Sequence, residues 1–227
     1  MSQYNSYHRP NRRRNTKQSK KAQVIKFLSA VGIILFVVIV YLLASSKDTQ
    51  SDETVPAALT LTNSYSMPNI KENLLTPNPF SRPQEKLTSV NGIVVHYVGN
   101  PGTSAEANRN YFNSLAKTKS TYASSHFIID LDGTIVQCIP LDEISYASNS
   151  RNNDTISIEV CHPDETGEFT KESYDALVAL TKWLCSKYEL DSNAVIRHYD
   201  VTGKLCPLYY VEHEDAWLTF KKDIFGK

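Results

Sequence analysis

Three side chains with reactive chemistry follow one another closely in residues 197–207. They are the imidazole of His198, the ammonium of Lys204 and the thiol of Cys206. Zinc prefers imidazole nitrogen and thiolate sulfur as ligands, at about 2.0–2.3 Å from the ion. A catalytic zinc commonly has three protein ligands and one open position for water. We therefore expect one catalytic Zn²⁺ at this segment, with a third ligand from elsewhere in the chain.

The third ligand is expected to be His96, at the end of the β-branched run 93–95. His198 and Cys206 also lie at or just beyond the end of a short strand that we expect at 195–198. Ligand sites in α/β folds lie at the ends of sheet strands, so the three side chains can converge there.

Two further residues suit hydrolysis at such a metal. Glu159 is the sole carboxylate of an alternating strand, on the face opposite Ile158. A carboxylate beside zinc takes a proton from water and later delivers one to a leaving nitrogen. Lys204, two residues before Cys206, would stabilise an oxyanion. The alternative for each residue is a role without chemistry: Glu159 as a surface carboxylate on a solvated sheet face, and Lys204 as a solvated loop lysine.

The elements that must position these residues follow from hydrophobic periodicity. Residues 81–227 are expected to form a single α/β domain with a central mixed β-sheet flanked by helices. Gly203 and Pro207 favour a loop over 198–207. We expect strands at 93–98, 126–129, 134–138, 156–161 and 195–198, and helices through Ala107–Leu115, after Thr170 and around Trp217–Ile224.

The N-terminal part differs in composition from this domain. Residues 1–26 carry eight Lys and Arg and no acidic residue, which predicts a cytoplasmic tail. Residues 27–44 are apolar and uncharged, as in a transmembrane signal anchor, which needs about 17–25 residues. A cleaved signal peptide, giving a secreted form, is the less favoured alternative. Residues 45–80 are rich in Ser, Thr, Asn and Pro and predict an extracellular linker.

The zero net charge of the whole chain hides this asymmetry. Beyond residue 26 the chain has 16 Lys and Arg against 24 Asp and Glu. A net acidic domain argues against nucleic acid as a partner. If Cys206 binds metal, Cys138, Cys161 and Cys185 cannot all pair, and we expect them to be small buried hydrophobes.

Through four ordered blocks, the segment from about residue 78 resembles the type-2 N-acetylmuramoyl-L-alanine amidases, which are related to phage T7 lysozyme and to peptidoglycan recognition proteins. The blocks are residues 93–97, 124–134, 153–159 and 197–207. The resemblance implies zinc ligands at His96, His198 and Cys206, a functional lysine at Lys204 and a catalytic acid/base at Glu159. It also implies an enzyme that acts on peptidoglycan, cutting between N-acetylmuramic acid and L-Ala. The membrane anchor and the extracellular position of the domain are expected from residues 1–44 alone.

Two positions depart from the family pattern. Ser125 occupies the place of the catalytic tyrosine of T7 lysozyme, which favours Glu159 as the acid/base. The loop at 144–149 has no histidine where many members have one for substrate. His126 is expected to line the cleft and bind substrate, with packing in the core as its alternative. A monomer is expected.

Two other functions remain open for this sequence. A non-catalytic peptidoglycan-binding module would be expected to lack a zinc ligand, but Cys206 is present. A zinc peptidase cutting within the stem peptide would use the same ligand chemistry.

Overall fold

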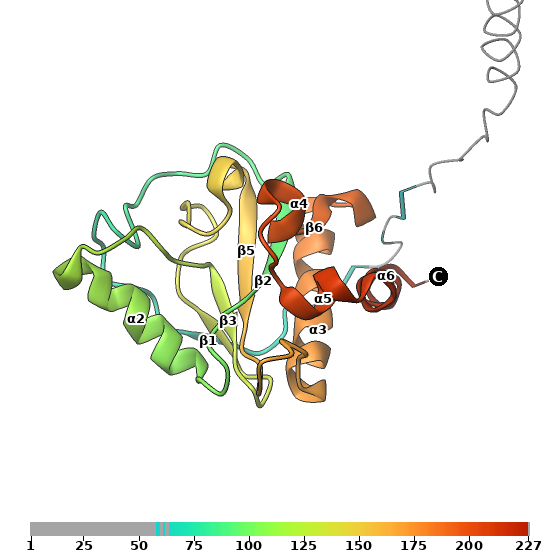
Figure 1. Cartoon of the computed structure of the whole chain (residues 1–227). Coiled ribbons are helices and arrows are strands. Elements are labelled where there is room, and N and C mark those ends of the chain that lie inside the picture. The colour runs from blue at the N-terminus through green and yellow to red at the C-terminus, as the bar shows by residue number, and fades with distance from the viewer. Residues whose placement is uncertain (1–57, 60, 62–63, 227) are drawn as a thin grey trace, which may run out of the picture. The chain divides into compact units, whose positions relative to one another are not determined.

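A six-stranded mixed sheet forms the centre of the computed structural model, which describes residues 58–59, 61 and 64–226 (Figure 1). The strand order is β1–β4–β3–β5–β2–β6. Only β3 and β4 pair antiparallel; all other neighbours are parallel. The strands are β1 (Ile70–Glu72), β2 (Gly92–Tyr97), β3 (Phe127–Ile129), β4 (Ile135–Gln137), β5 (Thr155–Val160) and β6 (Val195–Arg197). The expected mixed sheet is confirmed.

Helices cover both faces of this sheet, as expected. Helix α2 (Ala105–Thr118) lies on one face, and α3 (Lys171–Tyr188) lies on the other with α6 (Glu214–Phe225) beside it (Figure 1). The remaining short elements are η1 (Asn149–Arg151), η2 (Ser192–Ala194), α4 (His198–Thr202) and α5 (Leu208–Glu212). Ser104 caps α2 through the backbone N–H of Ala107, and Thr170 caps α3 through that of Ser173.

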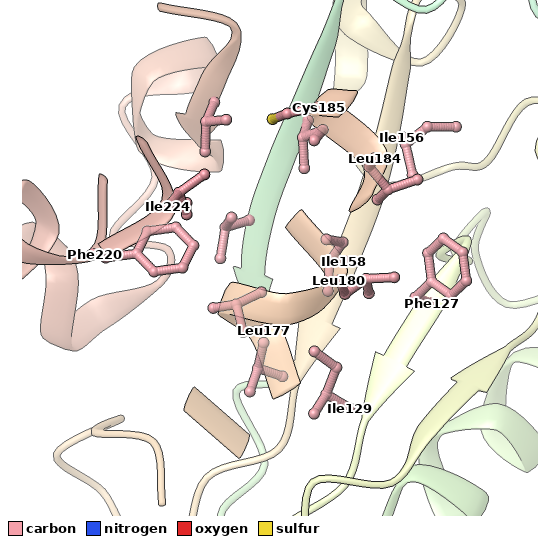
Figure 2. Close-up of a cluster of buried hydrophobic side chains, with 14 of the residues drawn as sticks. Phe127, Ile129, Ile156, Ile158, Leu177, Leu180, Leu184, Cys185, Phe220 and Ile224 are labelled. Carbon is pink, nitrogen blue, oxygen red and sulfur yellow. The ribbon is translucent and has the colours of Figure 1, made fainter. Parts of the chain in front are cut away.

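The larger core lies between the sheet and α3. Ile156 and Ile158 of β5 point to this face, where Leu177, Leu180 and Leu184 of α3 meet them (Figure 2). The alternation of β5 and the helical spacing of the three leucines thus face each other. Burying each such side chain contributes about 1.5–3 kcal/mol to folding.

The opposite face of the sheet carries both packing and polar side chains. Phe112 of α2 packs there in a smaller apolar cluster with Ile128 and Cys161. Because side chains alternate along β5, Ser157 and Glu159 share this face with Cys161. The strand therefore gives one face to the core and the other to the polar site described below.

The sheet begins earlier in the chain than we expected. Strand β1 lies within the segment predicted as a linker, and it pairs with β4 along one sheet edge. Leu75 is also buried, and its N–H donates to the Cys138 carbonyl at 2.8 Å. A linker boundary at residue 80 is therefore wrong. The error arose because a three-residue edge strand has too little periodicity to stand out among polar residues.

The segment after β6 also differs from the prediction. We expected a loop from His198 onward, but residues 198–202 form α4. Gly203 ends this helix at φ +78°, a left-handed conformation that glycine adopts without strain. Gly203 is thus a helix C-cap, and only the residues beyond it form a loop.

The predicted tail (1–26) and transmembrane helix (27–44) lie outside the described residues. Among the residues that are described, no helix is both long and apolar enough to cross a bilayer. All four cysteines are buried and free, so Cys138, Cys161 and Cys185 are the small core residues we expected.

Candidate metal centre

The structure brings the three predicted metal ligands together. His96 comes from β2, His198 begins α4 directly after β6, and Cys206 follows the α4 turn. One ligand atom from each lies within 4.8 Å of the others, and all three residues are buried. Because β2 and β6 are adjacent parallel strands, their carboxyl ends lie at the same end of the sheet, and both imidazoles lie there.

Hydrogen bonds orient the two imidazole rings. Nε2 of His198 lies 2.9 Å from Oδ1 of Asn149, and Nε2 of His96 lies 3.3 Å from Oγ of Ser148. An amide oxygen can only accept, so Nε2 of His198 carries a proton. Burial, with a smaller contribution from Lys204, lowers the pKa of this ring and favours the neutral form, in which Nδ1 keeps its lone pair. Such partners on the outer nitrogen are typical of metal-binding histidines.

The spacing of the donor atoms fits a tetrahedral zinc. Sγ of Cys206 lies 3.7 Å from Nδ1 of His96. Two ligands at the zinc–sulfur and zinc–nitrogen distances of a tetrahedral ion lie roughly 3.5 Å apart. Burial lowers the pKa of His96 well below its usual value, with smaller contributions from His198 and Lys204. Neutral imidazole is the form that binds a metal.

Glu159 lies beside the ligand group. It is the register partner of His96, and both line one groove. The residue is partly exposed, but its Oε2 atom is buried and has no hydrogen-bond partner among the described residues. Desolvation raises its pKa to about 8 although Lys204 opposes this shift. A bound divalent cation would lower that pKa again.

The groove around these residues has a volume of about 630 Å³. Lys204 is exposed and lines it, with Tyr122 and Tyr146 among the other lining residues. A second hollow of about 310 Å³ adjoins it at Glu159 and continues to Tyr111 on α2. Five of the six predicted site residues thus lie in one open groove, where an extended substrate can reach them.

His126 does not belong to the groove, and its predicted contact with substrate is wrong. The residue has no exposed surface. Its Nε2 donates to the Glu143 carbonyl at 2.8 Å, and its Nδ1 accepts from the backbone N–H of Ser157 at 3.1 Å. A carbonyl can only accept and an N–H can only donate, so the ring is neutral. Burial lowers its pKa to about 4.

Sequence reasoning missed the residues that position the ligands. Ser148 ends a loop and Asn149 begins η1. The turn of this loop is fixed by Asn152, since Oδ1 of Asn152 accepts from the N–H groups of Ala147 and Ser148. Asn149 has φ +52°, a conformation that asparagine tolerates better than most residues. The serine and asparagine content of this loop was the only signal, and it is common to ordinary turns.

Comparison with known protein families gives a match over the segment that holds the site residues. The family model described as N-acetylmuramoyl-L-alanine amidase matches residues 86–208. The chain belongs to the N-acetylmuramoyl-L-alanine amidase family. The matched segment contains all six site residues that we predicted, but not residues 64–85.

Relatives of this amidase-family chain include N-acetylmuramoyl-L-alanine amidase CwlL of Bacillus licheniformis, 32% identical over 171 residues. That alignment covers 70% of the chain and 47% of CwlL. BlyA of Bacillus subtilis (strain 168) is 30% identical, with 66% and 45% covered. The chain spans about half the length of these curated relatives.

Solved structures show the same fold. The catalytic domain of XlyA has a TM-score of 0.58 at 27% identity, covering 69% of this chain and 99% of that domain. PlyL, at 24% identity, has a TM-score of 0.59 and covers 69% of this chain and 97% of its own.

Proposed function

We propose that this chain is a zinc-dependent N-acetylmuramoyl-L-alanine amidase that cleaves the amide between N-acetylmuramic acid and L-Ala in peptidoglycan. The observation that carries the proposal is the convergence of His96, His198 and Cys206, with Glu159 beside them in one groove. The family match and the amidase names of several relatives support it.

The donor set fits zinc. Two neutral imidazoles and a cysteine sulfur, which would bind as the thiolate, match its ligand preference. The 3.7 Å between Sγ of Cys206 and Nδ1 of His96 suits a shared ion. When bound, zinc supplies Lewis-acid polarisation of a carbonyl and lowers the pKa of water. The residues that would hold it are His96, His198 and Cys206.

The remaining groups suit amide hydrolysis. Glu159 takes a proton from the attacking water, because its carboxylate faces the groove beside the ligands. As water adds to the lactyl carbonyl carbon, the ammonium of Lys204 stabilises the negative charge that develops on the carbonyl oxygen. Glu159 then gives its proton to the amine of L-Ala as that group leaves. The open groove admits a cross-linked polymer, which a closed pocket would exclude.

Metal content and product identity test this proposal. Full-length protein is loaded with zinc and incubated with purified sacculi, and newly formed L-Ala amino termini are quantified by mass spectrometry. We expect release that is lost after chelation and restored by zinc. Cys206→Ser should lose metal and turnover, whereas Cys185→Ser, at a buried cysteine outside the ligand group, should keep both. A zinc-replete protein that releases no L-Ala termini would refute the proposal.

The same assay separates the two other functions. Release of termini from within the stem peptide would identify a zinc peptidase. Muropeptide binding that survives chelation, with no turnover, would identify a binding module.

We further propose that residues 27–44 anchor the chain in the cell membrane as a single pass, with a monomeric domain on the wall side. The basic composition of residues 1–26 and the charge-free apolar run support this orientation. Protease added outside intact protoplasts should degrade the domain while the tail stays protected. Recovery of the domain in the culture medium, cleaved after residue 44, would instead indicate a secreted form.

A further inference from the structure

Three aromatic rings form a stack along one side of the groove. Phe80 stacks on Tyr122 with centroids 5.1 Å apart, and Tyr146 meets Tyr122 edge-on at 5.4 Å. Tyr122 lines the groove and is 60% exposed. A large ring that is supported by two neighbours and still exposed offers a flat apolar surface to a ligand.

Hydrogen bonds of the backbone hold together the three segments that carry these rings. The N–H of Ala123 donates to the Phe80 carbonyl at 3.1 Å, and the N–H of Ser124 donates to the Tyr146 carbonyl at 3.2 Å. In return, the N–H of Tyr146 donates to Oγ of Ser124 at 2.9 Å. The three backbone segments are thus held next to one another, and the rings contact each other at 5.1 and 5.4 Å. Less free energy is lost on binding when the groups that meet the ligand are already ordered.

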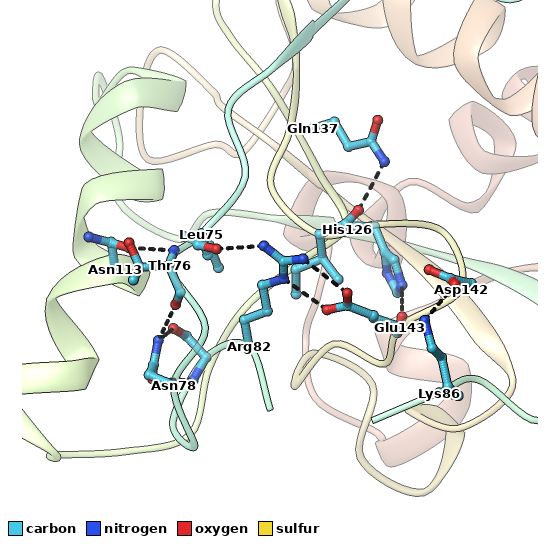
Figure 3. Close-up of polar contacts among 12 residues, drawn as sticks. Leu75, Thr76, Asn78, Arg82, Lys86, Asn113, His126, Gln137, Asp142 and Glu143 are labelled. Carbon is cyan, nitrogen blue, oxygen red and sulfur yellow. Dashed lines mark hydrogen bonds and ion pairs between the residues drawn. The ribbon is translucent and has the colours of Figure 1, made fainter. Parts of the chain in front are cut away.

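Phe80 belongs to a segment that the family model does not cover. Oδ1 of Asn78 accepts from the N–H groups of Phe80 and Ser81, which closes a tight turn. The guanidinium of Arg82 joins this turn to the rest of the domain (Figure 3). Its Nε and Nη2 donate to the two carboxylate oxygens of Glu143 at 2.8 and 2.9 Å, and its Nη1 donates to the Leu75 carbonyl. Residues 75–82 precede the matched range 86–208, whereas Glu143 lies within it.

We propose that the Phe80–Tyr122–Tyr146 stack is a saccharide subsite, which binds the sugar ring next to the muramoyl residue on the glycan strand. The proposal rests on the proposed amidase function for the identity of the polymer. A pyranose ring has one apolar face of C–H groups, which packs on an aromatic ring while its hydroxyls stay in water. Tyr122 meets this need because its ring is exposed in the groove that holds Glu159.

The first experiment measures binding without catalysis. Full-length protein is titrated with a trimer of N-acetylglucosamine, and affinity is measured by calorimetry for wild type, Tyr122→Ala and Tyr122→Trp. Loss of one ring contact should weaken binding about five- to tenfold, and Tyr122→Trp should restore it. Leu218→Ala, at an exposed apolar residue of α6, is the control and should bind as wild type.

The second experiment measures turnover on two substrates. Tyr122→Ala should raise KM on glycan strands by a larger factor than KM on a single muramoyl-peptide, which has no neighbouring sugar ring to bind. Unchanged oligosaccharide affinity in Tyr122→Ala, or equal losses on both substrates, would overturn the subsite. If wild type binds the trimer through Tyr122 but releases no L-Ala termini, the subsite stands and the amidase proposal fails.

Discussion

His96 and Glu159 are register partners on the adjacent parallel strands β2 and β5. Their side chains project from the same face of the sheet, opposite the core that packs on α3. A metal ligand and a candidate acid/base are thus held side by side by paired backbones rather than by loops. Rigid strands position catalytic groups more accurately than loops do.

Replacing the Glu159 carboxylate should separate proton transfer from metal binding. Glu159→Gln is expected to lower kcat by at least about 100-fold, the contribution of general acid–base catalysis. Zinc content, measured by mass spectrometry, should not change, because Glu159 is outside the ligand group. Glu106→Gln on α2, an exposed glutamate, is the control. Near-normal turnover in Glu159→Gln would remove this residue from the mechanism.

Asn149 should act on metal affinity through His198. Asn149→Gly keeps the left-handed backbone but removes the amide that accepts from Nε2 of His198. Loss of such a partner typically costs about 10–100-fold in metal affinity, to be measured by competition with a chelating dye. Asn193→Gly, at a distant exposed asparagine in η2, should leave affinity unchanged. A wild-type zinc affinity in Asn149→Gly would contradict this role.

The Arg82–Glu143 ion pair should stabilise the fold, since both side chains are largely buried, at 11% and 7% exposure. Arg82→Met leaves a buried carboxylate without its partner, which costs about 3–5 kcal/mol. Urea unfolding measures the change. Lys86→Met breaks the exposed pair with Asp142, at 67% and 69% exposure, and should cost less than about 1 kcal/mol. Equal effects of the two substitutions would argue against a structural role for Arg82.

His126 should make the fold sensitive to acid. Its folded-state pKa is about 4, below the usual value of 6.5, because burial disfavours the charged ring. The unfolded chain therefore binds a proton in this window when the folded chain does not, so stability falls as pH drops from about 6.5 to about 4. The free energy of unfolding should fall by roughly 3 kcal/mol over this range, because a difference of one pKa unit corresponds to about 1.36 kcal/mol.

Unfolding midpoints across this pH range provide the measurement. His126→Gln removes the titrating ring, so the variant should be less stable at neutral pH but lose less stability on acidification. The difference between the two pH profiles isolates His126 from other histidines. Parallel profiles for wild type and His126→Gln would show that this ring does not titrate on unfolding.

Much of the fold could be predicted because its signals are local. The alternation of Ile156, Ser157 and Ile158 determines which face of β5 is buried, and the leucine spacing of α3 determines its packing stripe. Edge strand β1 escaped prediction because its three residues are ordered by pairing with β4, which no local pattern encodes. Helix α4 was missed for a related reason, since five residues are too few for periodicity.

The sequence by itself determined the ligand chemistry: two imidazoles and a thiol at strand ends, with one carboxylate on an alternating strand. These properties depend on residue type and local spacing. Only the tertiary structure decided that His126 is fully buried in the core. It also decided that Asn149 hydrogen-bonds to His198 and that Phe80 stacks on Tyr122. Each of these contacts joins segments distant in the chain. Burial and hydrogen-bond direction follow from how such segments pack, so they appear only once the chain is folded.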